Sequence, residues 1–559
     1  MSDLPNFNNI YANLAESAYT GRPNNFPPGS YREKEKFYDY STDSTYKHKS
    51  GEVSFTKGGT NLPEGLDVDG NKKEGIVYLQ PDPTLKITDK TITTQVPKIN
   101  GGYETQTYIT GERQKGLLTD SDAGFNAYFV TDTPKLNKDT KKAYLAIRGS
   151  DAMSIDNLND WVGNDANFAL TNSYIPQAKL ANQALVEKIK EMKQKAPNAS
   201  LDVTAHSLGT MVSAQSVAKL YHDDRDAFKT IGKVVLFDGP DVVKSLKNMG
   251  LSDKEIKAVG EKVTYFVNPF DMVSMLNRTA PYKEQFGTVN VIVPLNFSTT
   301  FDSATSSHDF GEFQIDAKGN PLVAREDFHP EMLTAGHKLA KLIDKTLSQV
   351  KDLGVKGLTS GVILTALSGG VGTLMALGMT AAEAKAIYDD FNKAYTGIVA
   401  EAKEKSKAWN NEHIPDYQNR IRSASGSQKV ELRVELLQTV AQNAIFRSED
   451  FVAEVKTKLT QTKEEIQKEI TQGVQGISNM VHYLDYSEVS ALLSDFNMQN
   501  FWDEGVEDST NNEAKKYQTE IETFSATLMK VAQNIEQVDA QGALGFNNLM
   551  TQTQVNWGK

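Results

Sequence analysis

The stretch LDVTAHSLGTM, residues 201–211, decides the fold because it joins a predicted strand to a predicted helix through a serine. Its first five residues are typical of a buried strand, and small residues such as Thr210 open the helix that follows. A nucleophile on so tight a turn needs small residues two positions before and after it, because the turn is crowded. Ala205 and Gly209 meet that need, with alanine where glycine is usual. The stretch therefore predicts Ser207 as a nucleophile.

The segments on both sides of this turn alternate between strand and helix patterns. Apolar stretches predict strands at 143–150, 200–207, 233–239, 262–268 and 289–295, and periodic stretches predict helices at 175–195 and 209–223. Alternating strands and helices imply crossover connections and a mostly parallel sheet. The sequence therefore predicts an α/β fold of the hydrolase type, in which a serine nucleophile follows a strand.

The first part of the chain has a different composition. It is rich in Gly, Pro, Asn, Thr and Tyr, with short apolar stretches at Gly75–Leu79 and Phe125–Val130. Short apolar runs between turn residues are typical of strands. We therefore expect residues 1–110 to form an extension of the hydrolase domain that is rich in strands and loops.

Strand patterns end near Leu342, and helical patterns replace them. Apolar residues follow four-three spacing in two seams, typical of a coiled coil. The first seam comprises Val452, Val455, Leu459, Ile466, Ile470 and Ile477, and the second comprises Tyr517, Ile521, Phe524, Leu528, Val531, Ile535 and Val538. We place the domain boundary near residue 345, with the hydrolase domain at 1–345. Residues 346–559 are predicted to form an elongated helical bundle with a face available for partners.

The segment Gly357–Ala382 has no charged residue and several glycines. Its length is sufficient to cross a bilayer, whereas its glycines, serines and threonines favour a packed helical hairpin. Both interpretations stay open.

Bulk properties narrow the function. The formal charge of −12 argues against nucleic-acid binding, because phosphate neutralisation needs a basic surface. The chain has no cysteine, which excludes disulfides, thiolate metal sites and cysteine nucleophiles. Asp67–Asn71 (DVDGN) lacks the spaced acidic ligand of a calcium loop, so no metal site is predicted. No basic and apolar secretory signal is visible at the N-terminus, so we expect either that the protein stays inside the cell or that its export is read elsewhere in the chain.

The acid and the base of a hydrolase of this fold follow the serine in the order Asp, His. Asp271 comes just after the strand at 262–268, and Asp238, after the preceding strand, is its rival. Among eight histidines, His308 follows the last predicted strand by a loop, whereas His329 begins a later helix. Both histidines stay open, with His308 favoured. His206, beside the serine, should point its side chain away from that of Ser207 and serve packing.

An oxyanion hole is expected from the backbone amide of Leu208 and from a loop after an earlier strand. The segment AYLAIRGSDAMSIDNLNDW, residues 143–161, resembles the signature of class 3 lipases in that loop. The resemblance implies that Ser150 is the second oxyanion residue. PFDMVSML, residues 269–276, resembles the segment that carries the acid in these lipases, which favours Asp271.

The helical region carries a second resemblance. Tyr483–Phe496 and Val538–Leu549 are similar to parts of LXG domains, the helical targeting modules of type VII secretion toxins in Gram-positive bacteria. Here the helical part comes last, as in the reversed-order lipase toxins of that system. The resemblance implies a secreted lipase or phospholipase A that acts on membrane phospholipids or glycerolipids. It further implies export without a signal peptide, small helical targeting proteins as partners, and an immunity protein.

Two hypotheses follow from the sequence. The first is a serine carboxylic-ester hydrolase that uses Ser207, His308 and Asp271 without a metal or cofactor. The second is a catalytically inert hydrolase fold that acts as an adhesion or scaffold protein through its helical domain.

Overall fold

The structure is a computed structural model of the 559-residue chain. It describes residues 10–18, 46–49, 52–55, 60–61, 76–80, 82–97, 103–133, 135–149, 174–297, 307–308, 312–314, 321–353, 360–479, 485–525, 527–528 and 531–532. The chain divides into two compact units, Met1–Ser406 and Lys407–Lys559.

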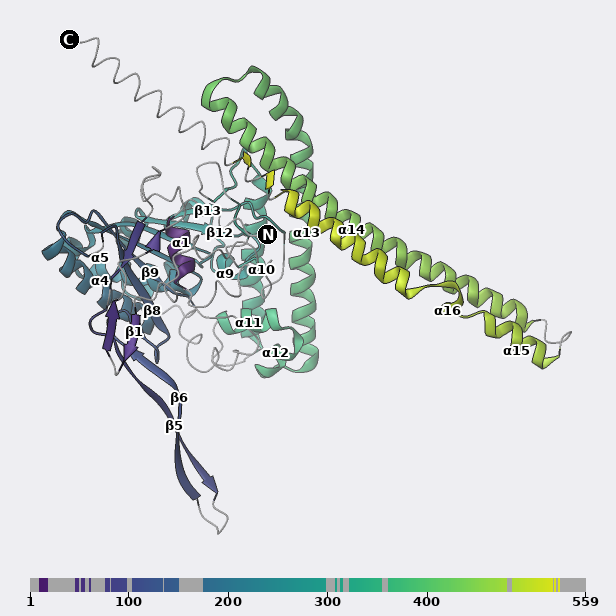
Figure 1. Ribbon diagram of the computed structural model, residues 1–559, viewed down its shortest axis with the longest axis horizontal. Coiled ribbons are helices and arrows are strands. Elements are labelled where there is room, and N and C mark those ends of the chain that lie inside the picture. The colour runs from purple at the N-terminus through teal and green to yellow at the C-terminus, as the bar shows by residue number, and fades with distance from the viewer. Residues whose placement is uncertain are drawn as a thin grey trace. The chain divides into compact units, whose positions relative to one another are not determined.

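A mixed β-sheet forms the centre of the first unit (Figure 1). Its strands lie in the order β13-β12-β11-β10-β9-β8-β7-β6-β5. The bounds are β5 Lys86–Pro97, β6 Tyr103–Lys115, β7 Thr119–Asp120, β8 Phe125–Thr131, β9 Lys142–Ile147, β10 Ser200–His206, β11 Ile231–Phe237, β12 Val263–Val267 and β13 Thr288–Val291. Strands β9 to β13 pair in parallel, and β5 to β9 pair antiparallel.

Helices connect the parallel strands, which confirms the predicted alternation. Between β9 and β13 they are α4 Pro176–Lys195, α5 Leu208–Asp223, α6 Arg225–Phe228, α7 Val243–Asn248, α8 Asp253–Gly260, α9 Met272–Met275 and the 3-10 turn η6 Tyr282–Glu284. Helices α4 and α5 pack against each other beside the sheet (Figure 1). Pro176 begins α4, where its missing N–H costs no helical hydrogen bond. The fold is that of an α/β hydrolase domain with a mixed sheet.

The expected strand-rich region at the N-terminal side is present. Long strands β5 and β6 form a hairpin that extends from the sheet (Figure 1), and β4 Ile76–Leu79 pairs with β8. The shorter strands are β1 Tyr46–Lys49, β2 Glu52–Phe55 and β3 Thr60–Asn61. Helix α1, Ile10–Ser17, is fixed to β10, because Tyr11 donates a hydrogen bond to Asp202 (2.9 Å) and Thr204 donates one to the Tyr11 carbonyl (2.9 Å).

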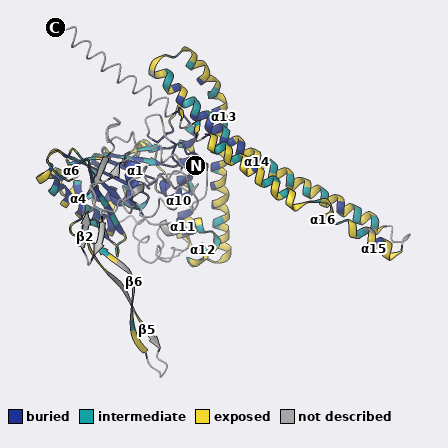
Figure 2. Cartoon of the chain, in the orientation of Figure 1, coloured by how far each residue is buried: buried dark blue, intermediate teal, exposed yellow. Residues whose placement is uncertain are grey.

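The core of the first unit lies between the sheet and its helices. Figure 2 shows the buried residues gathered there. Fully buried side chains on neighbouring strands include Leu145, Val203, Leu236 and Tyr265. Both faces of these parallel strands are largely shielded from water. Their sequences are therefore nearly continuous apolar runs. The core holds the strand ends in place, and the site residues follow those ends.

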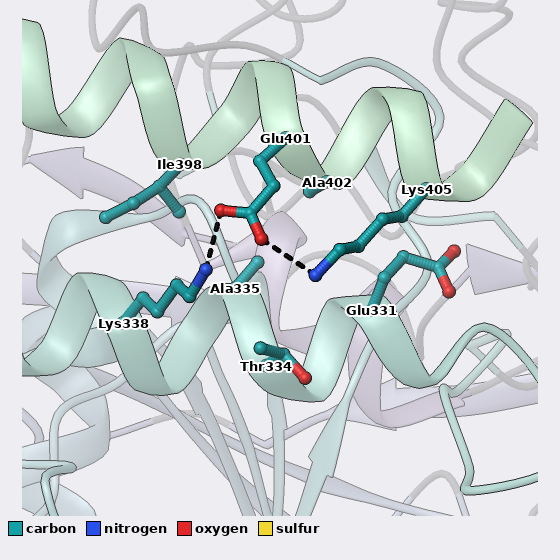
Figure 3. Close-up of a pocket in the computed structure, with 8 residues that line it drawn as sticks. All are labelled: Glu331, Thr334, Ala335, Lys338, Ile398, Glu401, Ala402 and Lys405. Atoms are coloured by element: carbon teal, nitrogen blue, oxygen red, sulfur yellow. Dashed lines mark hydrogen bonds and ion pairs between the residues drawn. The ribbon is translucent and has the colours of Figure 1, made fainter.

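The first compact unit runs past the change of sequence character near residue 345. It includes α10 Pro330–Asp352, α11 Ser360–Gly369, α12 Val371–Ala376 and the first part of α13 Ala381–Ser423. A small cleft between α10 and α13 is spanned by Glu401, whose carboxylate pairs with Lys338 (2.6 Å) and Lys405 (2.7 Å) (Figure 3). Packing of these helices on the hydrolase core, rather than a change in residue pattern, determines where the unit ends.

The segment Gly357–Ala382 forms two short helices where the structure describes it, from residue 360 onward. Gly370, with φ of 87°, separates α11 from α12. Ile363, Leu364 and Leu367 of α11 are buried. Within the described ranges, no helix is both long and apolar enough to span a bilayer. The burial of these α11 side chains and the packing of α11 against α12 favour the packed helical pair.

The second unit is helical. Its helices are α14 Gly426–Ser478, α15 Tyr486–Asp495, α16 Met498–Phe501 and a helix at 504–525. The end of α13 runs antiparallel to α14. Two contacts show this direction: Lys407 pairs with Asp450 (2.7 Å), and Asn410 donates a hydrogen bond to Gln442 (3.1 Å). A C-terminal helical region is therefore present, as expected.

The two predicted seams differ in burial. In α14, Val452 and Ile470 are buried. In the second seam, Tyr517, Phe524 and Val531 are 46%, 54% and 42% exposed. Residues 483–484 and 538–549, which carry part of the resemblance to LXG domains, lie outside the described residues.

Candidate active site

Ser207 occupies the predicted turn between β10 and α5. Its backbone has φ of 57° and ψ of −130°, a conformation that residues other than glycine rarely adopt. The Ser207 amide donates to the Phe237 carbonyl (3.0 Å), and the Thr210 hydroxyl donates to the Ser207 carbonyl (2.6 Å). These bonds hold the strained turn that a strand-to-helix nucleophile requires.

Close packing explains the small residues around this turn. A Cβ atom added at Gly209 would lie 2.7 Å from the Ile147 carbonyl oxygen and 3.1 Å from the Ala205 Cβ atom. Ile147 ends β9, so the start of α5 lies directly against the neighbouring strand. Glycine is therefore required at 209, and a small residue is required at 205.

A continuous hydrogen-bond chain links the three residues predicted as nucleophile, base and acid. The Ser207 Oγ atom lies 2.8 Å from His308 Nε2, and His308 Nδ1 lies 2.9 Å from Asp271 Oδ2. A carboxylate only accepts hydrogen bonds, so Nδ1 carries the proton and donates it to Asp271. Nε2 then has a free lone pair and accepts the Ser207 hydroxyl proton. This arrangement can activate the hydroxyl for attack on a carbonyl carbon.

The fully buried Asp271 is held by its own helix. It is the N-cap of α9, and its carboxylate accepts the amides of Val273 (3.0 Å) and Ser274 (2.8 Å). Two backbone donors and the imidazole replace the water that the buried carboxylate has lost. Three donors therefore hold the Asp271 carboxylate beside His308.

Asp238, the rival acid, has other partners. It lies just after β11 with φ of 50°, and its Oδ1 accepts the Asn268 amide (2.9 Å) and the Ser274 hydroxyl (3.0 Å). Burial, together with the nearby charge of Asp271, raises the pKa of Asp238 well above its usual range. Burial therefore favours the neutral form of Asp238, and Asp271 is the carboxyl group that lies at His308 Nδ1.

His206 is buried, as expected of a packing residue, but it also contacts the base. Its Nε2 lies 2.8 Å from the His308 carbonyl oxygen and 3.9 Å from Asp238 Oδ2. A carbonyl oxygen only accepts, so Nε2–H of His206 donates to it. Residue patterns carry no sign of this contact, because it joins two segments far apart in the chain.

His329, the alternative base, lies in a separate environment. It precedes α10 with φ of 51°, and its Nδ1 lies 2.7 Å from Glu331 Oε1 and 3.2 Å from Ser406 Oγ. The acid and the serine approach the same ring nitrogen, whereas a relay needs them on opposite nitrogens. The structure brings His308, rather than His329, to Ser207.

Arg278 is a buried residue of the site that sequence reasoning missed. Its guanidinium donates to the Gly239 carbonyl (2.8 Å) and to the Ser274 carbonyl (2.8 Å), and it lies 4.6 Å from the centre of the Tyr265 ring. It thereby joins the turn after β11 to α9. Arg278 lies in a short polar stretch between α9 and η6, and no residue pattern there indicates that it joins these two segments.

The expected oxyanion residues are only partly described. Leu208 is the first residue of α5, so its amide lies at a helix N-terminus, where the helix dipole favours negative charge. Ser150 and the loop after it lie outside the described residues, as does Asp67–Asn71. Among the residues that the structure describes, no group of three or more His, Asp or Glu side chains could hold a metal ion.

The parallel strands, the nucleophile turn and the Ser–Asp–His order define an α/β hydrolase domain. Residues 164–293 match the model of a family described as an alpha/beta hydrolase of unknown function (DUF900). The matched segment contains Ser207, Asp238 and Asp271 and ends before His308. No curated protein and no solved structure matches the chain.

Proposed function

We propose that the protein is a serine carboxylic-ester hydrolase whose catalytic residues are Ser207, His308 and Asp271. The observation that carries this proposal is the hydrogen-bond chain from Ser207 Oγ to His308 Nε2 (2.8 Å) and from His308 Nδ1 to Asp271 (2.9 Å). A strained nucleophile turn and a buried, hydrogen-bonded acid support it. An inert fold would have no need to keep all three features together.

The reaction follows from this geometry. His308 takes the Ser207 proton at Nε2 as Oγ attacks the ester carbonyl carbon, and the Asp271 carboxylate stabilises the imidazolium that forms. The tetrahedral intermediate collapses, the C–O bond to the alcohol breaks, and His308 protonates the departing alcohol. Water, deprotonated by His308, then attacks the acyl-enzyme and releases a fatty acid and free Ser207.

The negative charge of the tetrahedral intermediate needs donors that are already in place. The Leu208 amide, at the start of α5, supplies one. We assign the second to Ser150, on the resemblance of its segment to class 3 lipases. Neither the chemistry nor the assigned residues require a metal or cofactor.

The substrate class rests on the same resemblance. We propose acyl esters of membrane glycerolipids, cleaved as a lipase or phospholipase A cleaves them. Because an ester is hydrolysed at either acyl position by the same chemistry, the position depends on the lipid-binding surface rather than on the triad. Incubation of the purified full chain with mixed phospholipids, followed by mass spectrometry of released fatty acids and lysolipids, identifies substrate and position together.

The role of Ser207 is tested by Ser207→Ala. We expect this variant to lose ester hydrolysis and labelling by a serine-reactive phosphonate, since it removes the hydroxyl that donates its proton to His308 Nε2. Ser216→Ala is the matched control, because Ser216 is a buried serine of α5 whose hydroxyl donates a hydrogen bond to the Ser213 carbonyl in the same helix. Hydrolysis that persists in Ser207→Ala would contradict the proposal, and an inactive wild-type chain would favour an inert scaffold instead.

The helical unit supports a second, complementary role as a binding module. Tyr517, Phe524 and Val531 recur every seven residues and are 46%, 54% and 42% exposed. Apolar residues at this spacing form the seam of a coiled coil, which another helix would cover. With the resemblance to LXG domains, this face supports binding of small helical targeting proteins and export by a type VII secretion system. An immunity protein in the producing cell would follow from a toxin role.

This second role is tested in a Gram-positive host with a type VII secretion system. Phe524→Asp in the full chain should lower the amount of protein in the culture medium, because a charge on the seam prevents burial by a partner helix. Thr519→Asp adds the same charge at an exposed polar position of the same helix and serves as control. Equal secretion of both variants and the wild type would contradict this role.

A further inference from the structure

Helix α13 reaches the candidate active site through Tyr395. The Tyr395 side chain is 3% exposed, and its hydroxyl donates a hydrogen bond to the Phe270 carbonyl oxygen. Phe270 directly precedes Asp271, the acid of the triad. A residue of a helix that begins far beyond the hydrolase sequence pattern therefore bonds to the turn that carries the acid.

The same hydroxyl also neighbours the segment that carries the base. Ser307, which directly precedes His308, lies near the Tyr395 phenol, although the Ser307 hydroxyl makes no hydrogen bond to it. Burial and then the charge of Asp271 raise the pKa of Tyr395, and Ser307 lowers it by a smaller amount. The phenol is thus neutral, close to Asp271, and keeps the proton that it donates to Phe270.

The acid turn needs such support because its local bonds do not fix its distance from the base. The Val273 and Ser274 amides orient the Asp271 carboxylate within its own turn. His308 lies on a different segment, and the 2.9 Å bond between them depends on how the two segments are held together. Tyr395 lies where the segments preceding both residues meet.

We infer that Tyr395 is a positioning residue that fixes Asp271 relative to His308 by holding the backbone of Phe270. The inference rests on the proposed triad and extends it to α13. The helical segment 381–406 is then part of the catalytic unit, rather than only an attachment for the helical region. The Tyr395 hydroxyl touches no reacting atom, so its effect reaches the substrate only through Asp271 and His308.

Tyr395→Phe in the full chain tests this inference, because it removes the hydroxyl and keeps the ring. With a soluble p-nitrophenyl ester we expect kcat to fall by about 10- to 100-fold with little change in KM, since a small misplacement of catalytic groups has effects of this size. Tyr388→Phe is the matched control, being the same substitution on the same helix at a half-buried position. Far-UV circular dichroism and the thermal midpoint establish that each variant is folded at the assay temperature.

A second readout does not depend on activity. The His308 pKa, followed by NMR of histidine-labelled protein and assigned with His308→Gln, should fall in Tyr395→Phe and stay unchanged in Tyr388→Phe. Among the residues that the structure describes, Asp271, Ser207, His206 and Asp238 face His308, and the variant changes none of them chemically. A weaker Asp271–His308 bond is then the direct cause of a lower pKa.

The outcomes separate this inference from the proposed function. Wild-type kcat and an unchanged His308 pKa in Tyr395→Phe would overturn the inference and leave the triad intact. If the wild-type chain hydrolyses no ester, the proposed function fails, and the His308 pKa alone decides the inference. Should Tyr395→Phe not fold, Tyr395→Leu also removes the hydroxyl while keeping an apolar side chain, and wild-type values of kcat and of the His308 pKa in that variant would overturn the inference.

Discussion

The Nε2 atom of His206 lies 2.8 Å from the backbone carbonyl oxygen of His308, 102 residues away in the sequence. The residue that precedes the nucleophile therefore holds the backbone of the base. His206 ends β10 and Ser207 begins the turn, so the position of His308 is set by the same strand that sets the position of the serine. The two imidazole rings also contact each other, with centres 4.9 Å apart.

Loss of the His206 donor should slow the chemical step. We expect His206→Leu to lower kcat on a soluble ester by about 10- to 100-fold, because the His308 carbonyl loses its anchor and the ring shifts. His206→Gln can present an amide donor at a similar reach and should recover much of the loss. Steady-state kinetics on the two folded variants give the comparison. Equal kcat in wild type and His206→Leu would show that the contact serves packing only.

The two buried carboxyl groups should respond differently to amide replacement. Asp271→Asn is expected to lower kcat by about 10⁴-fold, because an amide favours the wrong imidazole tautomer. Asp238→Asn should keep kcat within about tenfold of the wild type, since the amide resembles the neutral carboxyl group that burial favours there. Kinetics with one soluble ester distinguish them. A larger loss in Asp238→Asn than in Asp271→Asn would reverse the assignment of the acid.

The raised pKa of Asp238 has a consequence for stability. Because the folded state holds this proton more tightly than the unfolded state, the group stabilises the fold below its ordinary pKa of 3.8, and this contribution is lost as the pH rises through the raised folded-state value. Asp238→Asn removes the titration and should flatten that part of the pH dependence.

Urea unfolding of wild type and Asp238→Asn between pH 5 and pH 9 measures this effect. The variant should gain stability relative to the wild type as the pH rises, because the unfolded wild-type chain releases a proton that the buried Asp238 holds more tightly in the fold. Parallel curves for the two proteins would mean that Asp238 titrates normally.

Two glycines should give opposite results when changed to alanine. Gly209→Ala is expected to lower the free energy of unfolding by about 1–3 kcal/mol, because the new methyl group would meet the Ile147 carbonyl and cannot be accommodated without a backbone shift. Gly397→Ala, within α13, has open space around the new methyl group and should raise stability by about 0.5–1 kcal/mol. Denaturant unfolding measures the free energy of unfolding of both variants. A Gly209→Ala chain as stable as the wild type would contradict the packing argument.

Much of the fold was predictable because its signals are local. Each strand from β9 to β13 is a short apolar run, and α4 and α5 carry helical periodicity, so residue order alone indicated an α/β sheet. The extent of the compact unit was less predictable. Helices α10 to α13 resemble the rest of the helical region in sequence, and only their packing places residues up to 406 with the hydrolase core.

For the candidate site, the sequence determined the nucleophile turn and a short list of partners. Small residues around Ser207 follow from local crowding, and the Ser–Asp–His order follows from the order of the strands. The choices of Asp271 over Asp238 and of His308 over His329 needed distances between segments, because each pair of candidates has similar local chemistry. The supporting contacts of His206, Arg278 and Tyr395 join residues far apart in the chain. Residue spacing carries no record of such contacts, so only the tertiary structure, which sets the distances and burial of these side chains, could decide them.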